Sequence, residues 1–257
     1  MKILVNDKVT NQINEMLKID LAPEVISSLI VIFILLILSI IVGIKAKRQD
    51  PLKKPKGILL VAEIGVDTFD GLVEDMMGPH FRGFGGYVLA IACYLFLAFI
   101  FGLTGLPSPM TNLAVPLSLA LCTFILIHAT SVKYTGFKYF KRYVDPFPFF
   151  LPINLISMWA PLLSLTLRLF GNAVAGWVLM SIVYSALGEL SSMIFSFINS
   201  PINSIFIAPI VTPILHAYFD LFSAFIQTTV FIFLTMIFVG QELPEDIDDT
   251  VLTKGGK

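Results

Sequence analysis

Charged residues are scarce in this chain. Asp, Glu, Lys and Arg make up 14% of its 257 residues, against about 25% in soluble domains. Gly83–Val132 contains no such residue, and Pro146–Gln241 contains only Arg168, Glu189 and Asp220. A soluble protein of this length could not bury so much apolar surface. The composition therefore excludes soluble enzymes and disordered chains, and it predicts a polytopic membrane protein.

Cysteine is rare, and basic residues are not in excess. The two cysteines, Cys93 and Cys122, lie in apolar segments without CxxC or metal-ligand spacing, which is typical of small buried side chains. We therefore expect no metal and no cofactor. The formal net charge of −1 leaves no basic patch, so the sequence predicts no nucleic-acid partner.

Long apolar segments run nearly from end to end, and they favour an all-α membrane fold with about five transmembrane helices. A helix of about 20 apolar residues spans the hydrocarbon core of a bilayer. The expected elements are a first helix at 25–44, a hairpin of two spans at 87–132, and a pair of long helices within 149–239. Because no soluble segment separates them, residues 1–257 are predicted to form one integral membrane domain.

The last two helical stretches, 149–196 and 203–239, are too long for simple spans. At 1.5 Å per residue each would extend on the order of 55–70 Å, which is about twice the hydrocarbon core. Steep tilt, kinking or re-entrant packing must follow. The expected break points are Pro161 in the first stretch, and Pro209 and Pro213 in the second.

Lys and Arg residues mark the loops expected on the cytoplasmic side. Residues 45–56 carry six basic residues against one acidic residue, and 133–142 carries four basic residues. This pattern predicts an outside N-terminus and a cytoplasmic C-terminus, with an acidic tail at 240–257. We expect a multi-pass protein in a lipid bilayer.

The segment 57–78 differs from the apolar stretches around it. Its acidic and apolar residues would fall on different faces of a helix. This favours an amphipathic helix lying at the cytoplasmic membrane surface. Because its polar face is acidic, a protein partner is expected there rather than anionic lipid.

Arg168 lies deep in an apolar stretch. A guanidinium stays protonated at any physiological pH, so it should face a carboxylate or a water-filled cavity. The alternatives are a structural salt bridge and a side chain that reaches the membrane interface. Small and polar residues at spacings of three and four form a stripe around it: Ser157, Pro161, Ser164, Arg168, Asn172 and Ala175.

A second polar stripe falls on the last helix, where Asp220 is the only carboxylate within 203–239. An ionisable residue at membrane depth indicates a functional site, although an internal Asp220–Arg168 pair would also account for it. His216 fits either a functional or a purely hydrogen-bonding role. Glu189 lies near an outer helix end, where an exposed end charge is the simpler interpretation. The stripe consists of His216, Asp220, Ser223 and Gln227.

These residues resemble the signature of the subunit a family of F-type ATP synthases. The resemblance covers roughly residues 57 to 240, and the Arg-Leu-Phe-Gly-Asn segment in a charge-poor helix is specific to it. It implies two long tilted helices lying against a ring of subunit c. The similar segments are Asn112-Leu-Ala-Val, Leu151-Pro-Ile-Asn-Leu-Ile-Ser, Ser164-Leu-Thr-Leu-Arg-Leu-Phe-Gly-Asn, Ala175-Gly and Phe225-Ile-Gln.

The resemblance also implies roles and partners. By it, Arg168 is the stator arginine, and Asn172 and Gln227 line the same site. The family often has Glu or His where this chain has Trp177, and His or Glu where it has Asp220. The outer proton relay is therefore expected to keep one acid and to lose its partner. The implied partners are the ring of subunit c, the peripheral-stalk subunit b and other ATP synthase subunits, and the chain is not catalytic by itself.

The predicted function is ion translocation in a rotary ATP synthase. Two offset half-channels would pass protons to and from a carboxylate on the ring, and Arg168 between them would favour its ionised form. Ser164 would lie on the inner side. The outer half-channel would contain the polar residues outward of Arg168, namely Asn172, His216, Asp220 and Glu189.

Two other functions are compatible with the residues alone. The first is a secondary transporter in which Arg168 binds an anionic substrate. Such folds often contain internal repeats, and no convincing repeat relates residues 25–132 to 150–240. The second is a membrane scaffold without transport, in which Arg168 and Asp220 would have only structural roles.

Overall fold

The computed structural model describes residues 22–50, 54–81, 83–136, 149, 151–196 and 206–242. Within these ranges every regular element is helical. The α-helices are α2 (Pro23–Arg48), α3 (Ile58–Met77), α4 (Gly85–Ile100), α5 (Ala114–Thr135), α7 (Leu151–Ile194), α8 (Ala208–His216) and α9 (Ser223–Gly240). The shorter turns are η1 (Pro79–Phe81), η2 (Phe101–Thr104), η3 (Pro109–Thr111) and a π-helical turn, η6 (Ala217–Phe222).

Five helical runs in the described residues are long and apolar enough to cross a membrane, which confirms the all-α polytopic prediction. They are α2, α4 with η2, α5, α7, and the run from α8 to α9. The first helix is longer than the predicted 25–44, because the basic residues at its C-terminal end remain helical. Cations are favourable in that last turn. The amphipathic helix predicted at 57–78 corresponds to α3.

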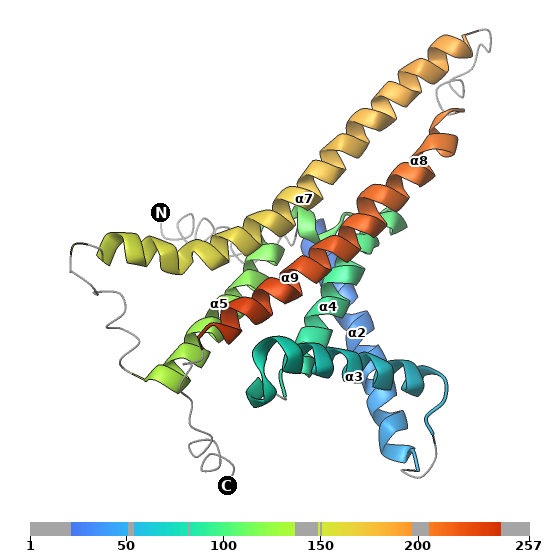
Figure 1. Cartoon of the computed structure of the whole chain (residues 1–257). Coiled ribbons are helices and arrows are strands. Elements are labelled where there is room, and N and C mark those ends of the chain that lie inside the picture. The colour runs from blue at the N-terminus through green and yellow to red at the C-terminus, as the bar shows by residue number, and fades with distance from the viewer. Residues whose placement is uncertain are drawn as a thin grey trace, which may run out of the picture.

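The helix α3 lies across α2 and α4 (Figure 1) and also packs on α9. Its apolar face buries Val73 and Met77. The contact with α4 is close, since a Cβ atom on Gly85 would overlap the Asp70 carboxylate. Asp70 thus lies against the first turn of α4, where the helix dipole favours a negative charge.

The core of the molecule lies where α4 packs on α9, with α2, α3 and α5 around this pair. Leu95, Phe231 and Met236 are almost completely buried there. One buried polar contact joins α2 to α4, because the hydroxyls of Ser28 and Tyr94 lie 2.6 Å apart. Each hydroxyl supplies the partner that the other needs in an apolar environment.

The first of the two long helices bends but does not break. α7 is continuous over 44 residues, about 66 Å at 1.5 Å per residue. Pro161 lies inside it without ending it, so α7 does not break there, and the helix as a whole is bent (Figure 1). The upper part of α7 runs beside α8.

The second long helix departs from regular geometry at a place that the prolines did not predict. Pro209 stands in the first turn of α8, where a missing N–H costs no hydrogen bond. Pro213 lies inside α8, and the α-helical pattern gives way only afterwards, at η6. Single π-helical turns inside α-helices are frequent at functional sites, and this one contains Asp220. The basic loop before α7 and most of the acidic tail at 240–257 lie outside the described residues.

Candidate functional site

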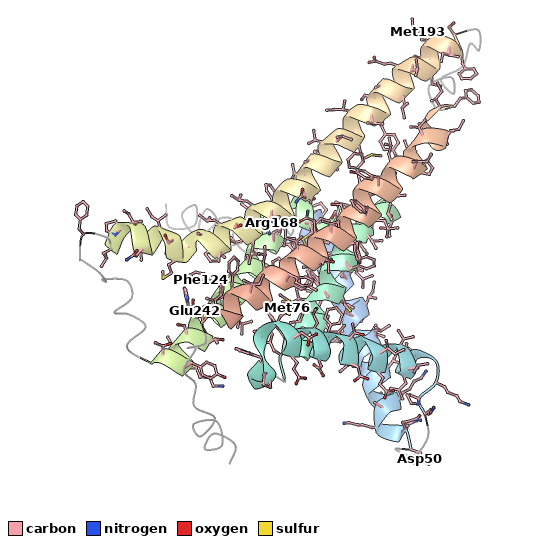
Figure 2. The ribbon with its side chains drawn as sticks, viewed as in Figure 1. Asp50, Met76, Phe124, Arg168, Met193 and Glu242 are labelled. Carbon is pink, nitrogen blue, oxygen red and sulfur yellow. The ribbon has the colours of Figure 1, made fainter. Side chains whose placement is uncertain are left out.

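Most of the surface of α7 is left uncovered by the rest of the chain. In the most apolar 18-residue stretch of α7, 6% of the residues are buried. In the corresponding stretches of α4, α5 and the α8–α9 run, 39% of the residues are buried. Arg168 lies near the middle of α7, at the bend (Figure 2). Its side chain is partly buried and has no ion-pair partner among the described residues. A salt bridge within the described part of the chain therefore does not account for this charge.

Small and polar residues border Arg168 along α7. The Asn172 side chain donates a hydrogen bond of 2.7 Å to the Arg168 carbonyl oxygen and so folds back on its own helix. Ser164 and Asn172 are exposed. A Cβ atom on Gly171 or Gly176 would meet nothing within 4 Å. No contact within the described chain requires small residues at these two positions.

The acid on the second long helix pairs with a histidine one turn away. His216 Nδ1 lies 2.5 Å from Asp220 Oδ2, and both side chains are partly exposed. The other ring nitrogen, Nε2, lies 2.8 Å from the hydroxyl of Tyr184 on α7. The imidazole thus joins a phenol on one long helix to a carboxylate on the other.

A cavity of about 430 Å³ lies beside this pair. It is bounded by α7, by the segment from α8 to the start of α9, and by the turn that contains η2 and η3. A cavity of this size that contains several polar side chains has room for several water molecules. The polar residues in its lining are Ser108, Thr111, Asn172, His216, Asp220 and Ser223.

The structure therefore brings together three predicted site residues, Asn172, His216 and Asp220, around one cavity. Gln227 does not line it, because it lies one further turn along α9, beyond Ser223. The Gln227 side-chain oxygen is buried and has no hydrogen-bond partner among the described residues. Glu189 is exposed and lies apart from the cavity lining, near the end of α7.

Tyr184 is a site residue that the sequence analysis missed. Nothing around it in the sequence distinguishes it from other aromatic residues of an apolar helix. The antiparallel arrangement of α7 and α8 contains a usable signal, because Tyr184 and His216 lie at similar distances, in residues, from the link between the helices. Residues related in this way face each other across a helical hairpin.

The fold and the site define a class: an all-α polytopic membrane protein with ionisable residues on its two long helical runs, and with a cavity beside them that contains several polar side chains. The family model described as ATP synthase A chain matches residues 25–240. Because this match spans most of the sequence, the chain belongs to the ATP synthase subunit a family.

Individual relatives agree with this family. ATP synthase subunit a of Mycoplasma genitalium is 30% identical over 227 residues, covering 82% of this chain and 76% of the relative. That of Mycoplasmoides gallisepticum is 28% identical over 231 residues, covering 86% and 78%. ATP synthase subunit a 2 of Syntrophotalea carbinolica is 30% identical over 209 residues, covering 79% and 80%. The chain is accordingly a membrane component of a bacterial ATP synthase, in the plasma membrane, and acts in ATP synthesis and proton transport.

Proposed function

We propose that this chain is the stator through which protons reach and leave the rotating ring of subunit c. The observation that carries the proposal is Arg168, a permanent charge on a long apolar helix that has no ion-pair partner among the described residues. A carboxylate on a ring helix crosses lipid only when protonated, since a bare charge there is costly. Opposite Arg168 its ionised form is favoured. The ring therefore takes up and releases protons on either side of this residue.

The outer half-channel is assigned to the cavity beside His216 and Asp220. The cavity contains polar groups from both long helices and from the turn between α4 and α5. Protons entering there would pass Asp220 to reach the ring. Ser164 lies before Arg168 on α7 and is assigned to the inner half-channel, while Glu189 would act only as an outer end charge. One proton crossing 100 mV releases about 2.3 kcal/mol, so several must be coupled to each ATP.

The ring of subunit c is proposed to lie against the uncovered face of α7. Gly171 and Gly176 have open space where a Cβ would be, and small residues allow a helix of another subunit to approach closely. The buried side-chain oxygen of Gln227 is a further group that a partner outside the described chain could satisfy.

The remaining assignments follow from charge and from the family. The N-terminus lies outside and the C-terminus in the cytoplasm, and the whole chain forms one integral membrane domain. The acidic face of α3 is the proposed contact for the peripheral-stalk subunit b. Membership of the ATP synthase subunit a family favours this function over a secondary transporter or a scaffold.

Site-directed photo-crosslinking on the assembled complex tests the contact with the ring. With both native cysteines replaced, a crosslinker attached at Ala175→Cys on α7 should form adducts with subunit c. The matched control is Phe33→Cys on α2, a position that is 62% exposed and apolar and is expected to face lipid. The proposed orientation of the ring would be contradicted if both positions formed adducts with subunit c in equal amounts. It would also be contradicted if the position on α7 formed no adduct with subunit c.

A further inference from the structure

Each ring nitrogen of His216 contacts a different kind of chemical group, a phenol on one side and a carboxylate on the other. Nε2 lies 2.8 Å from the Tyr184 hydroxyl, and Nδ1 lies 2.5 Å from Asp220 Oδ2. A neutral imidazole has one N–H donor and one bare acceptor nitrogen, and the bond made by one nitrogen decides the role of the other. The contact with Tyr184 therefore controls which protons Nδ1 can exchange with Asp220.

We propose that Tyr184, His216 and Asp220 form a proton relay specific to this chain, in which Tyr184 is a positioning residue and His216 delivers protons to Asp220. The inference rests on the proposed function and extends its outer half-channel. It also accounts for Trp177, which occupies a position where a polar partner for the acid was expected. His216, one turn before Asp220, takes the place of that partner.

The proton balance of the relay is simple. The Nε2–H group donates to the Tyr184 oxygen throughout, so Nδ1 is the atom that exchanges. In the imidazolium form Nδ1–H donates to the Asp220 carboxylate. Transfer breaks this N–H bond, forms an O–H bond on Asp220, and leaves a neutral imidazole whose Nδ1 accepts from the new O–H group. After Asp220 has passed its proton to the ring, Nδ1 takes a proton from a hydronium ion in the cavity, which leaves a water molecule behind, so each cycle moves one proton inward.

The surroundings of the relay are consistent with this role. His216 and Asp220 both line the cavity, so water has access to the pair. They are the only titratable groups in its described lining. From the facing helix α7 the group that contacts His216 is the Tyr184 hydroxyl, while Glu189 lies nearer the end of that helix, outside the lining. No described charge competes with Asp220 for the Nδ1 proton.

The relay is tested by comparing the ATP synthesis rates of the single variants of Tyr184 and His216 with the rate of the double variant. In vesicles carrying the complete ATP synthase, Tyr184→Phe should slow proton-driven ATP synthesis about fivefold, the effect of losing one hydrogen bond. His216→Gln should slow it further, because the imidazole that carries protons to Asp220 is then absent. The double variant should match His216→Gln alone, because Tyr184 acts only through the imidazole. The matched control, Tyr134→Phe at the end of α5, should leave the rate unchanged.

The outcomes separate the relay from the proposed function. If Tyr184→Phe and His216→Gln synthesise ATP at the wild-type rate while Arg168→Ala is inactive, the relay is wrong and the stator function stands. If Arg168→Ala also retains the wild-type rate, the proposed function itself is wrong. Independent, additive losses from Tyr184→Phe and His216→Gln would assign Tyr184 a packing role and overturn the relay. Should Tyr184→Phe fail to assemble, His216→Gln combined with Asp220→Asn replaces it, and a loss greater than that of Asp220→Asn alone contradicts the relay.

Discussion

Asp220 pairs with His216 across 2.5 Å on its own helix and makes no ion pair with Arg168. An internal pair between the two long helices would have neutralised both charges and given each a purely structural role. The arrangement instead leaves the cation of α7 and the acid of the second long helix with separate surroundings. This separation is what a mechanism with two offset half-channels requires.

Replacing the acid tests the outer half-channel. Asp220→Asn keeps the size of the side chain but removes its negative charge and its ability to take up a proton, so proton entry from the outside should slow by about tenfold or more. The measurement is proton-driven ATP synthesis in vesicles over the pH range around neutrality. Leu121→Ala, at an exposed apolar position on α5, serves as the control. Unchanged rates in Asp220→Asn at every pH would assign Asp220 a structural role.

The close approach of α3 to α4 predicts a stability effect. Gly85→Ala would place a Cβ atom against the Asp70 carboxylate, and overpacking of this kind typically costs about 1–3 kcal/mol. Unfolding of the purified subunit in detergent should therefore begin at a lower denaturant concentration. Gly86→Ala is the matched control, because a Cβ atom there would meet nothing within 4 Å. Equal stability of the two variants would show that α3 adjusts freely.

The proposed orientation predicts which side of the membrane reaches each loop. Leu106→Cys, in the exposed turn between α4 and α5, should react with a membrane-impermeant maleimide in intact cells. Lys54→Cys, in the basic segment between α2 and α3, should react only in inverted vesicles. Both variants carry replacements of Cys93 and Cys122. The reverse labelling pattern would invert the topology and exchange the two half-channels.

Much of the fold follows from the sequence, because apolar length and charge placement are strong constraints in a bilayer. The amphipathic segment 57–78 differs from α3 by one residue at each end. The position of η6 did not follow, since the prolines pointed to an earlier break, at Pro209 and Pro213.

Only part of the candidate site could be predicted from the sequence. Arg168 and Asp220 stand out because charges are rare in apolar helices. Tyr184 does not, because its role comes from the pairing of α7 with α8, which single-helix periodicity does not contain. Three members of the predicted stripe, His216, Asp220 and Ser223, line one cavity although η6 lies between the first and the last of them. Gln227 lies four residues further along α9 and does not line that cavity.

The central claim is that Arg168 separates two proton half-channels, and the most direct measurement is proton-driven ATP synthesis by the Arg168→Ala complex in sealed vesicles. Recovery of the intact complex first establishes that the subunit inserts and assembles. The account predicts that coupled synthesis is abolished, because a neutral residue no longer favours the ionised ring carboxylate or separates the half-channels. Synthesis at the wild-type rate by an assembled Arg168→Ala complex would contradict it.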